Sequence, residues 1–225
     1  AHLHRVAHVL EAALREVGLH HPGQERDQVI GPLALLGVFS ALAAVRRFYD
    51  FGARPRVAPC SKGQRMSKSL KRVRATLEAA GATPEIRETA LARTAVDAAT
   101  ALGCAVDQIA KSIVLRGENS GAALLFITAG AQQVDLDRAA ALAGEPLGKA
   151  DAALIRAQTG FAIGGVAPLG HITPPRAWFD RNLLQFPLVW AAAGTPHHVF
   201  CLEPQKMAQL SGAQVTDFTV VSQAM

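Results

Sequence analysis

The sequence predicts an α+β protein in which a mixed, curled β-sheet is flanked by helices. Half of the 225 residues are hydrophobic and the mean hydropathy is slightly positive, so the chain can bury a sizeable core. From Met66 onward, segments with helical periodicity are interleaved with segments that have strand-like patterns. Their order is irregular and repeats no strand-helix-strand unit, which favours a mixed sheet over a parallel one.

Each predicted element rests on a local pattern. Leu70, Val73 and Leu77 form one stripe of a helix that ends near Gly81. Thr94 and Asp97 have the spacing of a capping box, which predicts a second helix that stops at Gly103. The other expected elements are strands at 84–88 and 108–116, a hairpin partner at 122–128, helices at 135–143 and 150–158, a short strand from 159, strands at 188–192 and 198–202, a helix at 204–210 and a last strand at 215–220.

One lysine lies on the apolar face of the strand expected at 108–116. Because strand residues alternate between two faces, Lys111 shares its face with Ile109, Ile113 and Leu115. An ammonium group there costs free energy unless an anionic or hydrogen-bonding partner meets it. Two interpretations remain open: the stem lies along apolar surface with its head in water, or Lys111 belongs to a ligand site.

A glycine-rich loop follows the short apolar segment that begins near Thr159. It contains Gly164, Gly165, Pro168 and Gly170. Glycine permits positive φ and lets other groups approach the backbone closely, while proline stiffens the chain that follows. Such a loop is suited to presenting N–H groups to a substrate, although an ordinary tight turn also explains these residues.

Three ordered motifs carry a resemblance to a known family. They are Gln108-Ile109-Ala110-Lys111-Ser112, Gly164-Gly165-Val166-Ala167-Pro168-Leu169-Gly170, and Ala193-Gly194-Thr195-Pro196 ahead of a final strand. From Met66 to about Thr219 the chain resembles the YbaK / prolyl-tRNA synthetase-associated (INS-like) family of aminoacyl-tRNA deacylases. The resemblance implies a barrel-like curled sheet with outer helices. It also implies an enzyme that hydrolyses the ester between a mischarged amino acid and the 3' end of a tRNA, with tRNA(Pro) the first candidate.

The resemblance assigns roles to individual residues. Lys111, Gly164 and Gly165 are the catalytic candidates, and backbone N–H groups of the glycine loop are expected to stabilise the oxyanion. The substrate-binding candidates are Thr94, Ser112, Val166, Pro168, Gly170, Gly194, Thr195 and His198. Small and hydroxylic walls suggest an Ala, Ser, Thr or Cys side chain. Thr94 has a second, structural interpretation as a helix cap.

The activation of water is left open by the sequence. No Ser-His-Asp order and no carboxylate appear within the three motifs. Asp97, Asp107 and Asp180 approach the site only if the fold brings them there. The simplest hypothesis is that the glycine loop orients water and that the 2'-hydroxyl of the substrate helps to activate it.

The formal charge of +5 does not belong mainly to the expected catalytic region. Residues 1–65 carry 9 Lys and Arg against 5 Asp and Glu, and residues 66–225 carry 14 against 13. Contact with tRNA must therefore rest on a local patch. The candidates are Lys68, Lys71, Arg72 and Arg74 on the first helix, where a solvated helix face is the alternative. An aminoacyl-tRNA synthetase is a further candidate partner, and no DNA is expected.

No cofactor and no metal are expected. Cys60, Cys104 and Cys201 are far apart and form no C-x-x-C pair, which argues against a zinc site and fits a reducing cytoplasm. His4 and His8 have the spacing of a metal pair, but no third ligand with motif spacing follows.

Residues 1–65 are expected to form an N-terminal extension of unknown role, ahead of an editing domain at 66–225. The extension combines a helical segment at 2–17, an apolar run at 29–45 and a basic linker at 55–65. The apolar run has 17 residues, at the lower limit for a bilayer span, and includes glycine and proline, so a membrane span is not expected. No secretory pattern is present, and a cytoplasmic location is expected.

Two other functions remain open. The domain can be a non-catalytic module that binds tRNA or a synthetase with the same fold. Alternatively, residues 29–45 anchor the protein to a membrane and the remaining domain has another role.

Overall fold

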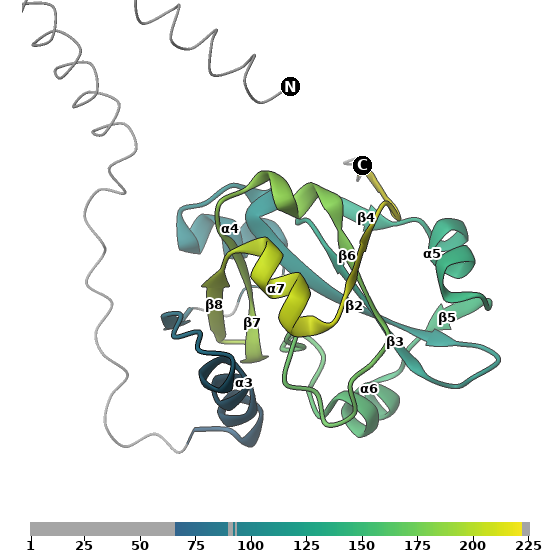
Figure 1. The fold of residues 1–225 in the computed structure, drawn as a ribbon, viewed down its shortest axis with the longest axis horizontal. Helices are drawn as coiled ribbons and strands as arrows, with labels where there is room; N and C mark the ends of the chain where they lie inside the picture. Colours follow the sequence, from purple (N-terminus) through teal and green to yellow (C-terminus); the bar gives the residue numbers. More distant parts are fainter. Residues whose placement is uncertain (1–65, 90–91, 93, 222–225) are drawn as a thin grey trace, which may run out of the picture. The chain divides into compact units, whose positions relative to one another are not determined.

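The computed structural model describes residues 66–89, 92 and 94–221 (Figure 1). The extension expected at 1–65, with its apolar run, lies outside the described residues. Of the helices that the structure describes, none is both long and apolar enough to cross a bilayer. The elements are α3 (Lys68–Ala79), β1 (Ile86–Glu88), α4 (Ala95–Leu102), η1 (Val106–Gln108), β2 (Ile109–Gly117), β3 (Ala123–Thr128), β4 (Gln132–Val134), α5 (Leu136–Ala143), β5 (Leu147–Lys149), α6 (Ala152–Thr159), β6 (Ala177–Asp180), η2 (Arg181–Gln185), β7 (Val189–Thr195), β8 (His198–Leu202), α7 (Pro204–Ser211), β9 (Gln214–Thr216) and β10 (Thr219–Val221).

Helix ends follow the capping residues in the sequence. The Thr94 hydroxyl accepts the N–H of Asp97, and the Asp97 carboxylate accepts the N–H of Thr94, which is the predicted capping box of α4. α4 stops at Gly103, whose φ is +67°. The structural interpretation of Thr94 is therefore confirmed.

The sheet is mixed and open. Its strands run in the order β1-β8-β7-β2-β3-β6-β9, and β4 pairs with β10 in a separate two-stranded sheet. β2 and β3 are antiparallel, whereas β2 is parallel to β7 and β3 is parallel to β6. The α+β class with a mixed sheet is confirmed. The two end strands, β1 and β9, do not pair with each other, so the sheet does not close into a barrel.

β2 forks away from β7, and this fork positions the site. The two strands pair only at Ile109↔Trp190 and Ala110↔Ala191. On the same edge, β2 next meets β5, beginning at Leu115↔Lys149. The stretch from Lys111 to Val114 thus pairs with β3 alone. A strand edge without a neighbour leaves space for side chains or a ligand.

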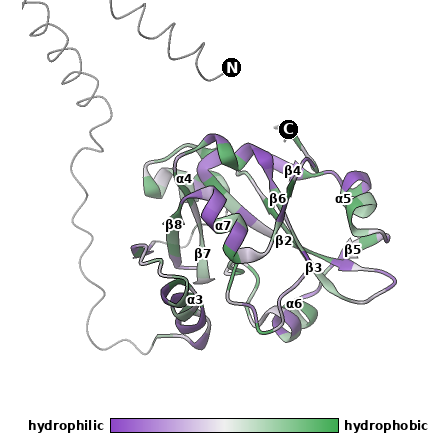
Figure 2. Cartoon of the chain, viewed as in Figure 1, coloured by the Kyte–Doolittle hydropathy of each residue, from purple (hydrophilic) through white to green (hydrophobic). Residues whose placement is uncertain are grey.

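The helices cover the sheet unevenly. The largest buried cluster lies between the sheet and α3, α6 and α7, with Val73, Ile155 and Met207 among its members. A second cluster packs α5 against β3 and β6, and it contains a stacked pair of rings, Phe126 of β3 and Trp178 of β6, whose centroids are 4.7 Å apart. In Figure 2 the hydrophobic colour concentrates on the central strands, while the helices have one apolar and one polar side.

Three sequence expectations are wrong. No strand forms after Thr159, because α6 runs through that residue and the chain then turns. The last strand at 215–220 is two short strands, β9 and β10, separated by Asp217 and by Phe218, which is fully buried against Phe126. β7 extends to Thr195, so Gly194 lies within the strand. Strands β4, β5 and β6 were not expected, since they have only 3 or 4 residues each.

Candidate functional site

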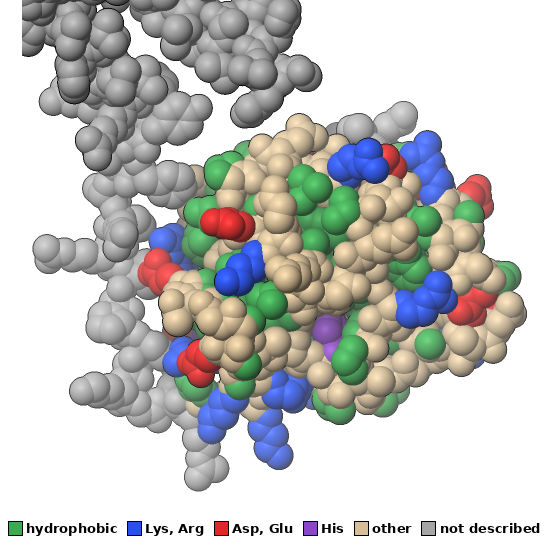
Figure 3. Space-filling model, in the orientation of Figure 1, with side chains coloured by type: hydrophobic (Ala, Val, Ile, Leu, Met, Phe, Trp, Pro, Cys, Tyr) green, Lys and Arg blue, Asp and Glu red, His purple; other side chains and the backbone are tan. Residues whose placement is uncertain are grey.

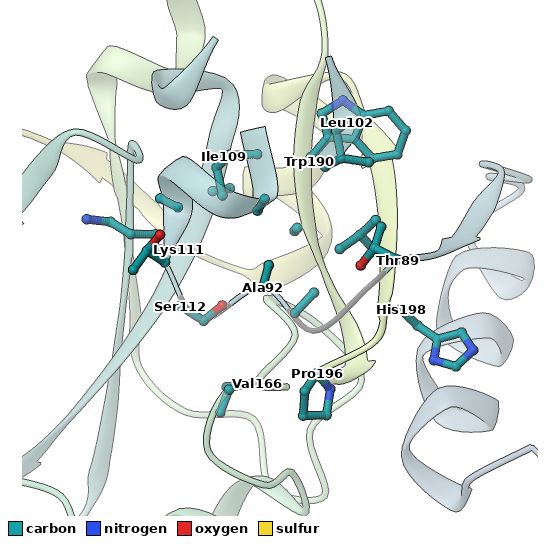
Figure 4. Close-up of a pocket in the computed structure, with 18 of the residues that line it drawn as sticks. Thr89, Ala92, Leu102, Ile109, Lys111, Ser112, Val166, Trp190, Pro196 and His198 are labelled. Carbon is teal, nitrogen blue, oxygen red and sulfur yellow. The ribbon is translucent and has the colours of Figure 1, made fainter. Parts of the chain in front are cut away.

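A pocket of about 280 Å³ opens at the fork between β2 and β7 (Figure 4). Its walls come from α4, β2, the glycine loop, β7 and β8. Apolar and small residues dominate, including Ala95, Ala98, Ile109, Ala191 and Trp190. The polar side chains in its wall are Thr89, Thr94, Lys111, Ser112, Thr195 and His198. Because β2 leaves β7 after Ala110, Lys111 and Ser112 both reach the pocket, although they belong to opposite faces of the strand.

Lys111 is half-buried, and its ammonium group has the hydrogen-bond acceptor and the nearby negative charges that a partly buried cation needs. Its Nζ donates a hydrogen bond of 2.5 Å to the backbone oxygen of Gln132. Burial lowers the pKa of Lys111 below its ordinary value of 10.5, while the Asp107 and Asp180 carboxylates raise it. Lys111 is therefore a desolvated cation balanced by two carboxylates. In Figure 4, Lys111 and His198 lie at opposite ends of the pocket.

The same two carboxylates hold the turn that supplies the acceptor of Lys111. Asp107 accepts the N–H of Ala131 at 2.9 Å, and Asp180 accepts the N–H of Ala129 at 3.1 Å. Asp180 is fully buried and also accepts the N–H of Asn182. The carboxylate of Asp97, in contrast, takes part in the capping box of α4. The sequence showed the carboxylates but not their convergence, because Asp107 and Asp180 lie 73 residues apart in the chain.

Two hydroxyl groups near Lys111 lack partners. The Oγ of Ser112 and the Oγ1 of Thr128 are buried and make no hydrogen bond within the described part of the chain. Thr128 is the cross-strand partner of Lys111, and Ser112 lines the pocket. An unsatisfied buried hydroxyl is costly, so Ser112 is suited to bind a polar group of a ligand.

The glycine loop approaches the pocket with part of its backbone. Gly164 has a φ of +82°, and a β-carbon at Gly165 would lie 2.7 Å from the backbone of Thr195. The N–H of Gly165 is already used, since it donates to the oxygen of Ala162 at 3.0 Å. Within the described residues, the N–H groups of Gly164 and Val166 donate to no protein acceptor. Both residues line the pocket, so they are better placed as oxyanion donors than Gly165.

A tight hairpin between β7 and β8 forms the rim. Thr195 and His198 are paired across the turn, and Thr195 Oγ1 lies 2.7 Å from His198 Nδ1. Burial lowers the pKa of His198 despite the neighbouring Glu88 carboxylate, so its ring is neutral at pH 7. His198 lines the pocket, whereas the adjacent His197 does not.

Three predicted binding residues lie away from the pocket. Pro168 and Gly170, in the second half of the glycine loop, line a separate hollow. A β-carbon at Gly170 would lie 3.2 Å from the Val73 backbone, and one at Gly194 would lie 2.9 Å from the Ser69 backbone. Gly170 and Gly194 thus let α3 approach the site closely. Within the described residues, no cluster of three or more His, Cys, Asp or Glu side chains is arranged to hold a metal ion.

Acidification is expected to destabilise the fold through His171. Burial against Phe161 lowers its pKa from 6.5 to about 4, only partly opposed by the nearby carbonyls of Ala167 and Pro168, and Arg72 lowers it further. The unfolded chain takes up this proton near pH 6.5 and the folded chain only near pH 4. The free energy of unfolding therefore falls as the pH drops through this range, by up to about 3 kcal/mol.

Urea unfolding at pH 7.5 and pH 4.5 measures this difference. His171→Gln has no titrating ring, so its stability should fall less between the two pH values than that of the wild type. Equal losses in both proteins would show that other groups control the acid sensitivity.

Comparison with known proteins finds a family match over the segment that contains the residues of the pocket. A family model for the aminoacyl-tRNA editing domain matches residues 89–210. The chain belongs to this family. The matched segment contains Lys111, the glycine loop and His198, and it leaves out α3. Editing of aminoacyl-tRNA in general is thus the family's function.

Individual relatives of this editing domain are similar over much of its length. A crystal structure of a candidate trans-editing enzyme for prolyl-tRNA synthetase is 44% identical, with a TM-score of 0.64, over 69% of this chain and 99% of that one. The hypothetical protein APE2540 is 25% identical, with a TM-score of 0.61, over 66% of this chain and 99% of that one. The uncharacterized protein YwhH of Bacillus subtilis (strain 168) is 30% identical over 122 residues, which are 54% of this chain and 77% of that protein.

Proposed function

We propose that this protein is a trans-editing deacylase that hydrolyses the ester of a mischarged small amino acid on tRNA, with tRNA(Pro) the first candidate. One observation carries the proposal. The partly desolvated Lys111 lines the same pocket as Gly164 and Val166, whose N–H groups have no acceptor among the described residues. These are donors for a developing negative charge, and an editing-domain fold carries them. The similarity to a candidate trans-editing enzyme for prolyl-tRNA synthetase supports the choice of tRNA.

The reaction needs an attacking water and a stabilised oxyanion. The oxygen of water adds to the ester carbonyl carbon and gives a tetrahedral oxyanion, and its proton passes to a base. Collapse of the intermediate breaks the bond to the ribose 3'-oxygen, which leaves with a proton as a hydroxyl. We assign the oxyanion to the N–H groups of Gly164 and Val166, with Lys111 supplying positive charge. The 2'-hydroxyl of the substrate is the proposed proton relay: it accepts the proton of the water while its own proton passes to the departing 3'-oxygen.

The dimensions and polarity of the pocket favour a small side chain. The cavity of about 280 Å³ has to admit the ester and the terminal ribose as well as the side chain, so only its part beside Ala95, Ala98 and Ala191 is left for the side chain. The unpartnered hydroxyl of Ser112 offers one polar contact, to a substrate hydroxyl or to its α-ammonium group. A methylene is discriminated by only about 1 to 3 kcal/mol, so a pocket of this size selects a class, here Ala, Ser, Thr or Cys.

A basic row on α3 is the proposed contact for the tRNA backbone. Lys68, Lys71 and Arg74 are exposed, and Arg74 is near enough to His198 to lower its pKa. In Figure 3, Lys and Arg side chains gather at the lower left, where α3 lies in Figure 1. The row therefore begins beside the pocket rim. Arg72 does not belong to it, because its guanidinium faces the protein.

Removing this row is expected to weaken tRNA binding and its salt dependence together. In Lys68→Gln/Lys71→Gln/Arg74→Gln, the slope of log Kd against log salt should decrease by about 0.7 to 0.9 for each lost phosphate contact. Filter binding or fluorescence anisotropy measures the slope between about 50 and 300 mM NaCl, the range in which counterion release dominates. Arg156→Gln on α6, also exposed, is the matched control and should keep the wild-type slope. An unchanged slope in the triple variant would move the tRNA contact elsewhere.

The function is tested with the full 225-residue chain and a panel of charged tRNAs. Ala, Ser, Thr and Cys on tRNA(Pro) are compared with prolyl-tRNA(Pro) and with each amino acid on its own tRNA. Release of one small amino acid from tRNA(Pro), with prolyl-tRNA left intact, is the expected result. A terminal 2'-deoxyadenosine should then abolish release, and normal cleavage of that substrate would exclude the 2'-hydroxyl as proton acceptor.

The other outcomes assign the remaining functions. Tight tRNA binding without any release would make the protein a binding module of the same fold. Absence of both release and tRNA binding, together with a need for detergent to keep the full chain in solution, would favour the membrane-anchored alternative.

A further inference from the structure

One arginine outside the matched editing segment joins both ends of the glycine loop. The loop runs from Gly160, which ends α6, to Gly170. Arg72 Nη2 donates to the backbone oxygen of Gly160 at 2.7 Å, and Arg72 Nε donates to the backbone oxygen of Gly170 at 3.2 Å. A single guanidinium thus bridges two carbonyls that are ten residues apart in the chain.

We infer that Arg72 is a positioning residue, which holds the loop so that the N–H groups of Gly164 and Val166 face the pocket. This inference rests on the proposed deacylase function. Arg72 touches neither the pocket nor any group assigned to the reaction. It acts through the loop that carries those groups, and its partners are backbone atoms.

The contacts around Arg72 suit an arginine and no other cation. The guanidinium is planar and presents several donors in a fixed fork, so one side chain can bond two separate carbonyls. The same group lies over the ring of Phe161, at 5.1 Å from its centroid, and Phe161 is fully buried. Phe161 is itself part of the loop, so the ring fixes a third point of the loop against α3.

Glycines at both ends allow this close contact. A β-carbon at Gly160 would lie 2.6 Å from Arg72 Nη2, and one at Gly170 would lie 3.2 Å from the Val73 backbone. Both glycines have positive φ, +76° and +75°. Ser69, one turn away on α3, adds a long hydrogen bond of 3.4 Å to the Gly160 oxygen. Three bonds and one ring contact therefore converge from a single helix onto one loop.

α3 also supports the opposite wall of the pocket. A β-carbon at Gly194 in β7 would lie 2.9 Å from the Ser69 backbone, and Gly165 lies against the Thr195 backbone that follows. α3 thus contacts the glycine loop and β7 at the point where the two meet. The element that positions the proposed oxyanion site lies at 68–79, ahead of the matched segment 89–210.

The alternative role of Arg72 is a direct contact with the tRNA backbone, together with the other cations of α3. The two roles predict different kinetics. A positioning residue changes the geometry of the reacting groups and so lowers kcat, whereas an RNA contact changes affinity and so raises KM and reduces the salt slope. A displacement of about 1 Å at a catalytic group can cost about 100-fold in rate.

The test compares Arg72→Gln and Arg72→Lys with Arg156→Gln in the full chain. Two quantities are measured: kcat and KM on the charged tRNA that the panel identifies, and amide hydrogen exchange of residues 160–171. Arg72→Gln should lower kcat about 10- to 100-fold with KM within about twofold of wild type. Exchange at Phe161 and Gly165, whose N–H groups donate to the Thr159 hydroxyl and the Ala162 oxygen, should speed up while α5 keeps its protection. Arg72→Lys keeps the charge over Phe161 but reaches only one carbonyl, so both effects should be intermediate. Arg156→Gln should match the wild type.

Each other result has a definite meaning. Unchanged exchange in the loop, or a raised KM with normal kcat and a reduced salt slope, overturns the inference. If the wild type releases no amino acid from any tRNA, the proposed function fails. Faster loop exchange in the Arg72 variants would still show that Arg72 holds the glycine loop in place. If Arg72→Gln does not fold, Arg72→Lys decides by the same two measurements.

Discussion

Lys111→Met is expected to lower the rate of aminoacyl-tRNA hydrolysis about 10²- to 10³-fold, the typical loss when one donor to an oxyanion is removed. Methionine keeps the length of the stem and removes the ammonium group that Gln132 and the two carboxylates hold beside the pocket. It also removes the cost of keeping that charge desolvated. The variant also leaves the fully buried Asp180 carboxylate without its nearby cation, so the urea midpoint should fall modestly, while activity falls far more than this loss of stability explains.

Lys149→Met is the matched control for this variant. Lys149 is an exposed lysine on β5, which pairs with the same strand β2. Single-turnover release of the amino acid and urea unfolding are measured for both proteins. Wild-type rates in Lys111→Met would remove Lys111 from the proposed mechanism. A lost rate accompanied by a large loss of stability would make its role structural.

Asp180→Asn is expected to reduce the free energy of unfolding by about 3 to 5 kcal/mol. The Asp180 carboxylate is fully buried, and its two oxygens accept the N–H groups of Ala129 and Asn182. An asparagine side chain accepts hydrogen bonds only through its oxygen. Its NH₂ group would therefore face one of these two backbone N–H groups, donor against donor. The variant also removes one of the two negative charges that balance Lys111.

The activity of Asp180→Asn should fall together with its stability. Asp180 holds the turn that offers the Gln132 oxygen to Lys111, so a shift of this turn moves the lysine. Asp217→Asn is the control, because Asp217 is exposed and its ion pair with Arg181 is 3.6 Å long. Urea unfolding at pH 7 compares the two. A loss in Asp180→Asn no larger than in Asp217→Asn would contradict the role of Asp180.

The local elements of this fold follow from short-range patterns. The stripe of Leu70, Val73 and Leu77 is the buried face of α3, and Thr94 with Asp97 caps α4 as their spacing predicts. Asp135 and Gly144 bound α5. These features depend on residues three or four apart, and the hydrogen bonds of a helix have the same range. Periodicity and caps therefore suffice for them.

The short strands could not be read in the same way. β9 and β10 have three residues each, too few for an alternation to be visible, and the buried Phe218 between them makes the segment look continuous. The region after Thr159 is apolar because Phe161 enters the core, without forming a strand. Burial and strand pairing are different causes of the same apolar composition.

The sequence by itself determined the helices, the hairpin of β2 and β3, the place of Lys111 on its strand, and the family to which the chain belongs. The tertiary structure decided the pocket. The divergence of β2 from β7 brings Ser112 and Lys111 into one cavity, Asp107 and Asp180 converge on the lysine, and Arg72 is bonded to the glycine loop instead of facing solvent. Such contacts join residues far apart in the chain, and no local pattern encodes which distant backbone atom a side chain will meet.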